Sequence, residues 1–445
     1  MRAESLARRA RALALVLIVA APAGAVAQDP PALRLTLADA RARALGASHR
    51  IAEALAREQA AKATVEARQA LERPVVSAVA GYTRTNHVLE FTVPTPTGLR
   101  AIYPDIPDNY RSRIDLQWPI YTGGRADALE RAARADAGAA SADVDTTRAD
   151  LRLEVARAFW AVVTAKASVS VLERGVARAQ AHATDARQRL AAGLVPPNDV
   201  ASAQAQEARQ RMLLIEAGNQ YALAQADLAR LTGIEPGQAI EPEGTLESET
   251  TPGQPLDALV TEGRGARTER RALELRIASA EAQGDAAHAA RRPTVAIGAG
   301  ADYARPNPRI FPRARNWDDS WDAGVSVSWA LWDGGRAAAD RAQASHVAEA
   351  GRQRLSEFDS LLALEVRQRT LDIDSGRAAV TAAGEAVRAA AEAHRVVTER
   401  YRAGVIAHTE VLDAEVALLQ AELDRTRALA GVRLAEARLE RAVGR

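Results

Sequence analysis

The chain has 445 residues, of which 47% are hydrophobic and only 4% aromatic, and its formal net charge at pH 7 is +1. A charge so close to balance gives no reason to expect a nucleic-acid partner. The chain contains no cysteine, which excludes disulfides, thiolate metal sites and a lipid-modified N-terminal cysteine.

The N-terminus has the features of a secretory signal peptide. A basic stretch that begins at Arg2 precedes an apolar run at 13–20, and small residues at 25–27 fit a cleavage site. An N-terminal membrane anchor is the alternative, but the apolar run is too short to span a bilayer. We therefore expect residues 1–27 to be removed. No later stretch has 18 consecutive apolar residues, so no transmembrane helix is predicted after the signal.

The mature chain contains an internal twofold repeat. Residues 118–125 (WPIYTGGR) match residues 329–336 (WALWDGGR) at an offset of 211. Each half is too long for a solenoid repeat, so we interpret the pattern as duplication of a whole structural unit. The predicted repeats are residues 28–250 and 251–445. Further pairs at the same offset are residues 189–193 with 400–404, and Gly233 with Gly444.

Each half is predicted to contain a helix, two strands and a long helical hairpin, in that order. The first helices, residues 37–71 and 256–291, are rich in alanine, glutamate and arginine. They end shortly before Pro74 and Pro293, because the residue that precedes a proline is disfavoured in a helix.

The predicted strands alternate strictly between two kinds of side chain. Their apolar face carries an aromatic residue near one end, and their other face is small or polar. This pattern is typical of a transmembrane barrel strand. A half-buried strand of a soluble sheet is the alternative, but four strands flanked by long helices would not form their own core. The strands are residues 75–84, 113–121, 294–303 and 324–331, and the membrane-interface aromatics are Trp118, Tyr121, Trp329 and Trp332.

Four strands cannot close a conducting barrel, because bacterial barrels begin at about eight strands. The strands must therefore be pooled between subunits, and three copies give a twelve-stranded barrel. The segments between the strands, residues 87–111 and 304–319, are rich in proline and are predicted as extracellular loops.

Two very long helices follow the strands. Residues 125–190 and 336–402 contain no proline and little glycine, and each would span on the order of 100 Å. Their alanine-rich interior predicts close, coiled-coil-like packing rather than a thick core. A further helix returns in each half, at residues 199–231 and 410–442, so that each half holds a helical hairpin whose tip is far from the strands.

The hairpin tips carry helix-ending and helix-starting residues. Gly193 and Gly404 are predicted C-caps, and Asp199 and Thr409 are predicted N-caps of the returning helices. His408 also lies at the second tip, where a solvated histidine is favoured over a metal ligand because a full ligand set is missing.

Two carboxylates at the second tip are candidate functional residues. Glu410 and Asp413 are three residues apart at a helix start and therefore share one face. Three subunits would place six such carboxylates in a ring, which favours cations at a constriction. The alternative is plain helix capping, since acidic residues stabilise a first turn through the helix dipole.

This order of elements resembles the TolC-type outer membrane efflux proteins over essentially the whole mature chain. The most specific segments are residues 118–125 and 329–336 and the hairpin tips at 192–200 and 401–413. The resemblance implies an α+β membrane protein, a homotrimer with a twelve-stranded transmembrane β-barrel of four strands per subunit. A long periplasmic α-helical barrel would continue it and narrow to an entrance at the tips.

The resemblance also implies roles for single residues. Glu410 and Asp413 match the acidic positions that ring the periplasmic entrance in that family. Asp199 and Tyr401 match members of the bond network that holds the entrance shut. An arginine of that network falls on Ile406 here, which leaves the closing contacts of this chain open.

The implied function is a passive exit duct of a tripartite export system in the cell outer membrane. Its implied partners are outer-membrane lipid, a periplasmic adaptor (membrane fusion) protein and an inner-membrane RND, ABC or MFS transporter, with no cofactor, metal or catalysis. No phosphate-binding loop, HExxH motif or serine elbow occurs, so we do not expect an enzyme. Small-molecule or drug efflux is the favoured interpretation, and type I protein secretion and metal-ion efflux are alternatives. A periplasmic coiled-coil scaffold would not explain the alternating strands.

Overall fold

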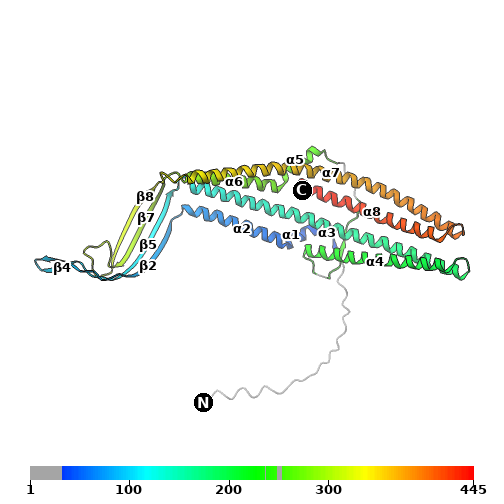
Figure 1. Cartoon of the computed structure of the whole chain (residues 1–445), viewed down its shortest axis with the longest axis horizontal. Helices are drawn as coiled ribbons and strands as arrows, with labels where there is room; N and C mark the ends of the chain where they lie inside the picture. Colours follow the sequence, from blue (N-terminus) through cyan, green and yellow to red (C-terminus); the bar gives the residue numbers. More distant parts are fainter. Residues whose placement is uncertain (1–32, 236, 248–252) are drawn as a thin grey trace, which may run out of the picture.

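The computed structural model describes residues 33–235, 237–247 and 253–445. The predicted signal peptide, residues 1–27, lies outside the described residues. The molecule is elongated, with a four-stranded sheet at one end and long helices that extend away from it (Figure 1).

The main sheet is antiparallel, with the strand order β2-β5-β7-β8. Its strands are β2 (Val75–Arg84), β5 (Asp108–Tyr121), β7 (Thr294–Arg305) and β8 (Asp318–Ser328). The four predicted strands are confirmed, but residues 329–331 lie beyond β8. The ladder ends there because Ser328 pairs with Thr294, the first residue of β7 after Pro293, and proline has no N–H for a further bond.

Residues 87–111 connect two strands of the main sheet as predicted, but they contain secondary structure that was not predicted. This segment contains an antiparallel hairpin of β3 (Phe91–Thr95) and β4 (Gly98–Tyr103), and β5 already begins at Asp108. Gly98 allows the tight turn because its φ is 122°. The prolines of the segment had favoured a loop, because proline cannot donate a ladder hydrogen bond. An edge strand nevertheless tolerates proline.

The strand register separates the sheet into two chemically different faces. Residues that pair across antiparallel strands point to the same face. One face, here called the apolar face, carries residues such as Val76, Ile114 and Val325, all exposed in this single chain. The opposite, polar face carries Arg113, which forms ion pairs with Asp302 of β7 and with other carboxylates.

The long helices match the predicted ranges closely. Helix α3 (Arg125–Ala191) and helix α7 (Arg336–Arg402) each have 67 residues, while α4 (Pro197–Thr232) and α8 (His408–Val443) each have 36. We call α3 with α4 the first hairpin and α7 with α8 the second hairpin. Both hairpins point away from the sheet (Figure 1).

The shorter helices are interrupted where single helices were expected. Residues 37–71 form α1 (Leu37–Ala47), α2 (His49–Gln69) and a 3-10 turn η1 (Ala70–Glu72), and residues 256–291 form α5 (Leu256–Ala266) and α6 (Thr268–Ala289). The break between α1 and α2 occurs at Ser48, whose side chain accepts a hydrogen bond from the Ile51 N–H at 3.4 Å. The break between α5 and α6 occurs at Arg267, which donates to the Ala442 carbonyl at 3.2 Å.

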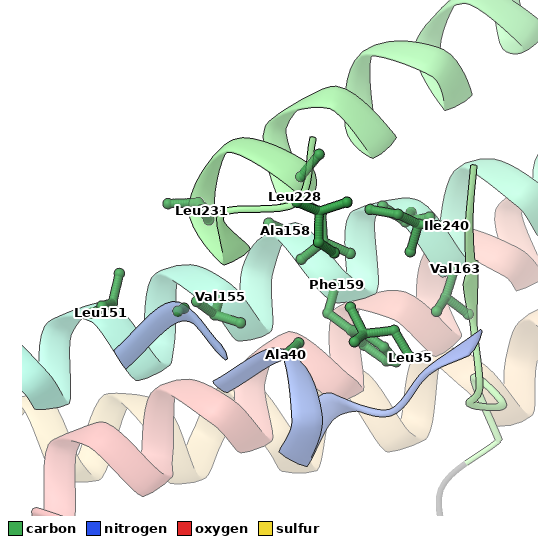
Figure 2. Packing of buried hydrophobic residues seen from close by; sticks show 14 of the residues in the cluster. Leu35, Ala40, Leu151, Val155, Ala158, Phe159, Val163, Leu228, Leu231 and Ile240 are labelled. Atoms are coloured by element: carbon green, nitrogen blue, oxygen red, sulfur yellow. The ribbon is translucent and has the colours of Figure 1, made fainter. Parts of the chain in front are cut away.

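The largest apolar core lies midway along the helices, next to a small parallel sheet that was not predicted. This sheet pairs β1 (Leu33–Leu35) with β6 (Ile240–Pro242). Phe159 of α3 is 1% exposed and packs with Leu35, Leu228 and Ile240 (Figure 2). The core therefore joins both ends of the first half to the middle of α3.

Among the described residues, α3 alone is long and apolar enough over one stretch to cross a membrane by length and composition. The sequence prediction counted only uninterrupted apolar runs and therefore missed this stretch. Because 44% of it is buried within the protein, its composition is accounted for by packing in the helical bundle.

Candidate functional site

The two hairpin tips, residues 192–196 and 403–407, have the same backbone design. Gly193 (φ 72°) and Gly404 (φ 74°) adopt the left-handed conformation, which confirms their predicted role in ending α3 and α7. In the first tip the Leu194 N–H donates to the Arg189 carbonyl at 2.9 Å, and in the second the Val405 N–H donates to the Arg400 carbonyl at 3.0 Å. These bonds fix the direction in which each returning helix begins.

The predicted N-caps of the returning helices are wrong. The N-cap of α4 is Pro196 and that of α8 is Ala407, and neither forms a side-chain capping bond. Proline at the first helical position, Pro197, starts α4 because its φ is already helical. Asp199 is instead the third residue of α4, and Thr409 is the second residue of α8.

The acidic residues of the tips lie at the surface. Glu410 and Asp413 are exposed on α8, and Asp199 is half-buried on α4. Asp199 accepts a hydrogen bond from the Asn198 amide at 3.2 Å. The exposed pair is therefore free to face solvent or another copy of the chain.

Tyr401 is buried, unlike the exposed carboxylates of Glu410 and Asp413. Its side chain is 4% exposed, and its hydroxyl is buried without a hydrogen-bond partner among the described residues. The guanidinium of Arg189, on α3, lies 4.7 Å from the centre of the Tyr401 ring and donates to the carbonyls of Tyr401 and Arg402 at 3.3 and 3.4 Å. Tyr401 thus holds the second hairpin against the first rather than facing solvent.

A buried histidine pair lies beside Tyr401 and was missed by the sequence analysis. His182 of α3 and His408 of α8 are stacked, with ring centroids 4.7 Å apart and an Nε2 to Nδ1 distance of 3.1 Å. The expectation of a solvated His408 is wrong, because this residue is 4% exposed. The sequence holds one local indication of this cluster: His182 and Arg189 are seven positions apart and therefore share one face of α3.

Burial controls the titration of this group of side chains. It lowers the pKa of His182 and of His408, because a buried imidazolium loses its hydration, although the nearby Glu415 carboxylate acts in the opposite direction. Burial also raises the pKa of the Tyr401 hydroxyl. Within the described ranges, no group of at least three His, Cys, Asp or Glu side chains is placed to hold a metal ion.

The predicted interface aromatics lie where the sheet meets the helices. The indole N–H of Trp118 donates to the Glu72 carbonyl at 3.1 Å, and that of Trp329 donates to the Arg291 carbonyl at 3.0 Å. Tyr121 and Trp332 are exposed at the same end. The Trp118 bond joins the end of β5 to η1. The Trp329 bond joins the segment after β8 to the segment after α6.

A second group of aromatic residues lies at the opposite end of the sheet and was not predicted. Tyr82 contacts Tyr110 at 5.0 Å between ring centroids, and Tyr303 stacks on Trp317 at 5.0 Å. Along β5, Trp118 lies eight positions after Tyr110. At about 3.3 Å per residue these aromatics are about 26 Å apart, close to the height of the apolar band of a transmembrane barrel.

Comparison with known proteins identifies a family whose members resemble this chain in sequence. The family model described as "Outer membrane efflux protein" matches residues 40–234 and 265–445. Protein CyaE of Bordetella pertussis is 29% identical over 285 residues, which are 63% of this chain and 58% of that protein. The cobalt-zinc-cadmium resistance protein CzcC of Cupriavidus metallidurans is 28% identical over 169 residues, which are 38% of this chain and 40% of that protein. The matches thus span less than two thirds of either relative.

Solved structures share the fold. The outer-membrane channel OprN aligns with a TM-score of 0.76 and 20% identity over 92% of this chain and 89% of that chain. VceC of Vibrio cholerae aligns with a TM-score of 0.76 and 21% identity, covering 92% and 96%. CusC aligns with a TM-score of 0.78 and 16% identity, covering 92% of both chains. At these identities the likeness establishes the architecture.

Proposed function

The chain belongs to the outer membrane efflux protein family, and from this premise we propose that it is the exit duct of a tripartite export system. Members of this family are channels rather than enzymes, located in the outer membrane with helices that extend into the periplasm. In the proposed assembly, three copies form one channel. A periplasmic adaptor and an inner-membrane transporter deliver the substrate to its hairpin tips.

The unpaired edges of the main sheet support assembly from several copies. Among the residues that the structure describes, β2 and β8 each have a neighbour on one side only. An open edge in a membrane would leave backbone groups without hydrogen bonds. Three four-stranded sheets would close a twelve-stranded barrel of ordinary size. Helix α7 also exposes a stripe of apolar residues that another copy would cover, namely Val347, Leu361, Leu364 and Leu371.

The two faces of the sheet support its place in the membrane. The apolar face would contact lipid, and the polar face, with Arg113 and its ion pairs, would line the lumen. We propose that Trp118, Tyr121, Trp329 and Trp332 mark the periplasmic interface, and that the aromatics around Tyr110 mark the outer one.

We also propose that residues 28–250 and 251–445 are structural repeats. The equal lengths of α3 and α7, and of α4 and α8, support this proposal. Gly233 and Gly444 end their helices with φ of 67° and 84°, and each approaches the end of a short helix. Such matching detail at matched positions is expected of a duplicated unit.

The exposed carboxylates of the second tip are the proposed entrance ring. Glu410 and Asp413 of three copies would place six carboxylates around the periplasmic opening, a ring that favours cations. Asp199 and Tyr401 would hold the entrance shut. For Tyr401 the supporting observation is its burial against Arg189 of the other hairpin.

The test is the ion selectivity of the purified protein in planar bilayers. We expect Glu410→Gln combined with Asp413→Asn to lower the cation-to-anion permeability ratio towards one. A matched control, Glu216→Gln with Asp424→Asn, removes two exposed carboxylates far from the tip and should leave the ratio unchanged. An unaltered ratio in the tip variant would remove the ring from the proposal, and a wild-type protein that does not conduct would overturn the channel itself.

The substrate class is the finer part of the proposal. Small-molecule efflux is favoured, and metal-ion efflux is the second candidate because of the likeness to CzcC, a protein named for cobalt, zinc and cadmium resistance. Deletion of the gene, followed by growth with antibiotics, dyes, detergents and metal salts, separates them. Sensitivity to several unrelated organic compounds would support drug efflux, and sensitivity to metals alone would support the second candidate. Unchanged growth with altered secreted proteins would favour protein secretion.

A further inference from the structure

The stacked histidines form a direct link between the two hairpins. His182 belongs to α3 and His408 to α8, and their facing nitrogens are 3.1 Å apart. One nitrogen must donate and the other must accept, because each neutral imidazole offers one donor and one acceptor. Protonating both rings would leave two donors, and two positive charges, at this distance. The contact therefore requires that at least one ring be neutral.

The surroundings of the pair combine buried, unsatisfied polar atoms with several charged groups. The ring of Tyr401 packs against both imidazoles at centroid distances of 5.6 and 5.8 Å. His408 Nε2, the Tyr401 hydroxyl and one Glu415 oxygen are buried without hydrogen-bond partners among the described residues. The titratable and charged groups that face the pair are Asp185 and Arg189 on α3, Asp199 on α4, His394 and Tyr401 on α7, and Glu415 on α8.

We propose that His182 and His408 form an acid-sensitive latch that holds the two hairpins of one subunit together at their tips and releases them when protonated. The latch is a property of a single subunit, so it goes beyond the proposed channel function and does not depend on the trimer. The nearby carboxylates of Asp185, Asp199 and Glu415 favour a first positive charge on the pair, so the second proton is the disruptive one.

The direction of the pH effect follows from proton linkage. Burial lowers the pKa of both histidines in the closed pair, whereas a histidine exposed to water titrates near 6.5. The separated state therefore binds protons more strongly, and falling pH favours separation. Between pH 7.5 and 5.5, the opening equilibrium should rise by up to about tenfold for each proton that is bound only in the separated state.

The test is hydrogen exchange of the full-length protein at pH 7.5 and 5.5, corrected for the intrinsic exchange rate. The amides of residues 398–412 report opening of the second tip, and those around Phe159 provide an internal reference in the same molecule. We expect tip protection in the wild type to fall by more than about twofold, and by up to about 100-fold, at the lower pH, while the reference stays constant.

Substitutions separate titration from packing. His182→Phe combined with His408→Phe keeps two flat stacked rings but removes the titrating groups, so its tip protection should change less than about twofold between the two pH values. His346→Phe alters an exposed histidine of α7 and should respond like the wild type. Wild-type tip protection that is independent of pH overturns the latch even where the double variant does not fold, and so does a folded double variant that responds like the wild type.

Conductance measured on the same preparations distinguishes the two proposals. A protein that conducts but has a pH-insensitive tip retains the channel function and loses the latch. A protein whose tip responds to pH but does not conduct retains the latch and loses the channel function.

Discussion

Gly233 offers a quantitative test of how the helix ends are joined. It ends α4 with a φ of 67°, and a Cβ added there would lie 2.7 Å from the Cβ of Ala47 at the end of α1. Gly193 has a similar φ of 72°, but an added Cβ would have no atom within 4 Å. Both Gly→Ala substitutions impose the left-handed strain of about 1–2 kcal/mol. Only Gly233→Ala adds overpacking, which costs about 1–3 kcal/mol more.

Hydrogen exchange of the full chain measures this difference locally, which avoids assuming that a protein of this size unfolds in one step. We expect Gly233→Ala to lower the protection of the α1 and α4 amides about 10- to 100-fold more than Gly193→Ala lowers that of the first tip. Gly444→Ala should repeat the effect in the second half, since its added Cβ would lie 2.8 Å from the Cβ of Ala266. Equal losses of protection in the Gly233 and Gly193 variants would refute the reasoning. They would show that α1 moves away from the added Cβ without a loss of stability.

Three further predictions concern polar contacts. Arg441→Met should lower the local stability at the ends of α6 and α8 by about 1.5–3 kcal/mol, measured by hydrogen exchange, because it removes the ion pairs of Arg441 with Glu269 and Asp150 while Arg267 still pairs with Glu269. Burial would raise the pKa of Glu269, but the hydrogen bond from Arg441 contributes to a net lowering. Wild type should therefore be more stable than Glu269→Gln at neutral pH, and this difference in stability should vanish as pH falls below about 4. A difference that persists in acid would contradict this reasoning. Trp118→Phe removes the indole bond to the Glu72 carbonyl and should cost about 1 kcal/mol, measured as the shift of the unfolding midpoint in detergent.

The long helices were predictable because their limits are written locally. Helix α7 begins after Gly335, whose φ is 87°, and ends before Gly404, whose φ is 74°. Between these glycines, residues 336–402 contain no proline, so the helix has no reason to stop. The same logic, applied to Gly124 and Gly193, defines α3.

The features that were missed depend on contacts between distant segments. The break at Arg267 exists because its guanidinium reaches the carbonyls at the end of α8, some 174 residues later. The burial of His408 likewise depends on His182, which lies 226 residues earlier in the chain. Neither partner can be identified from local periodicity, because a helical pattern defines which residues share a face but not which helix covers that face.

The second tip is joined to the first hairpin by an arginine that the sequence analysis did not single out. The family resemblance implies an arginine where this chain has Ile406, so an alignment alone suggests that one closing contact is lost. In the structure, Arg189 approaches from α3 instead, stacks on Tyr401 and donates to the carbonyls of Tyr401 and Arg402. A guanidinium needs only an aromatic face and nearby acceptors, and here the first hairpin supplies it to the second. The histidine pair adds another link between the two hairpins, and both links join residues more than 200 positions apart in the chain.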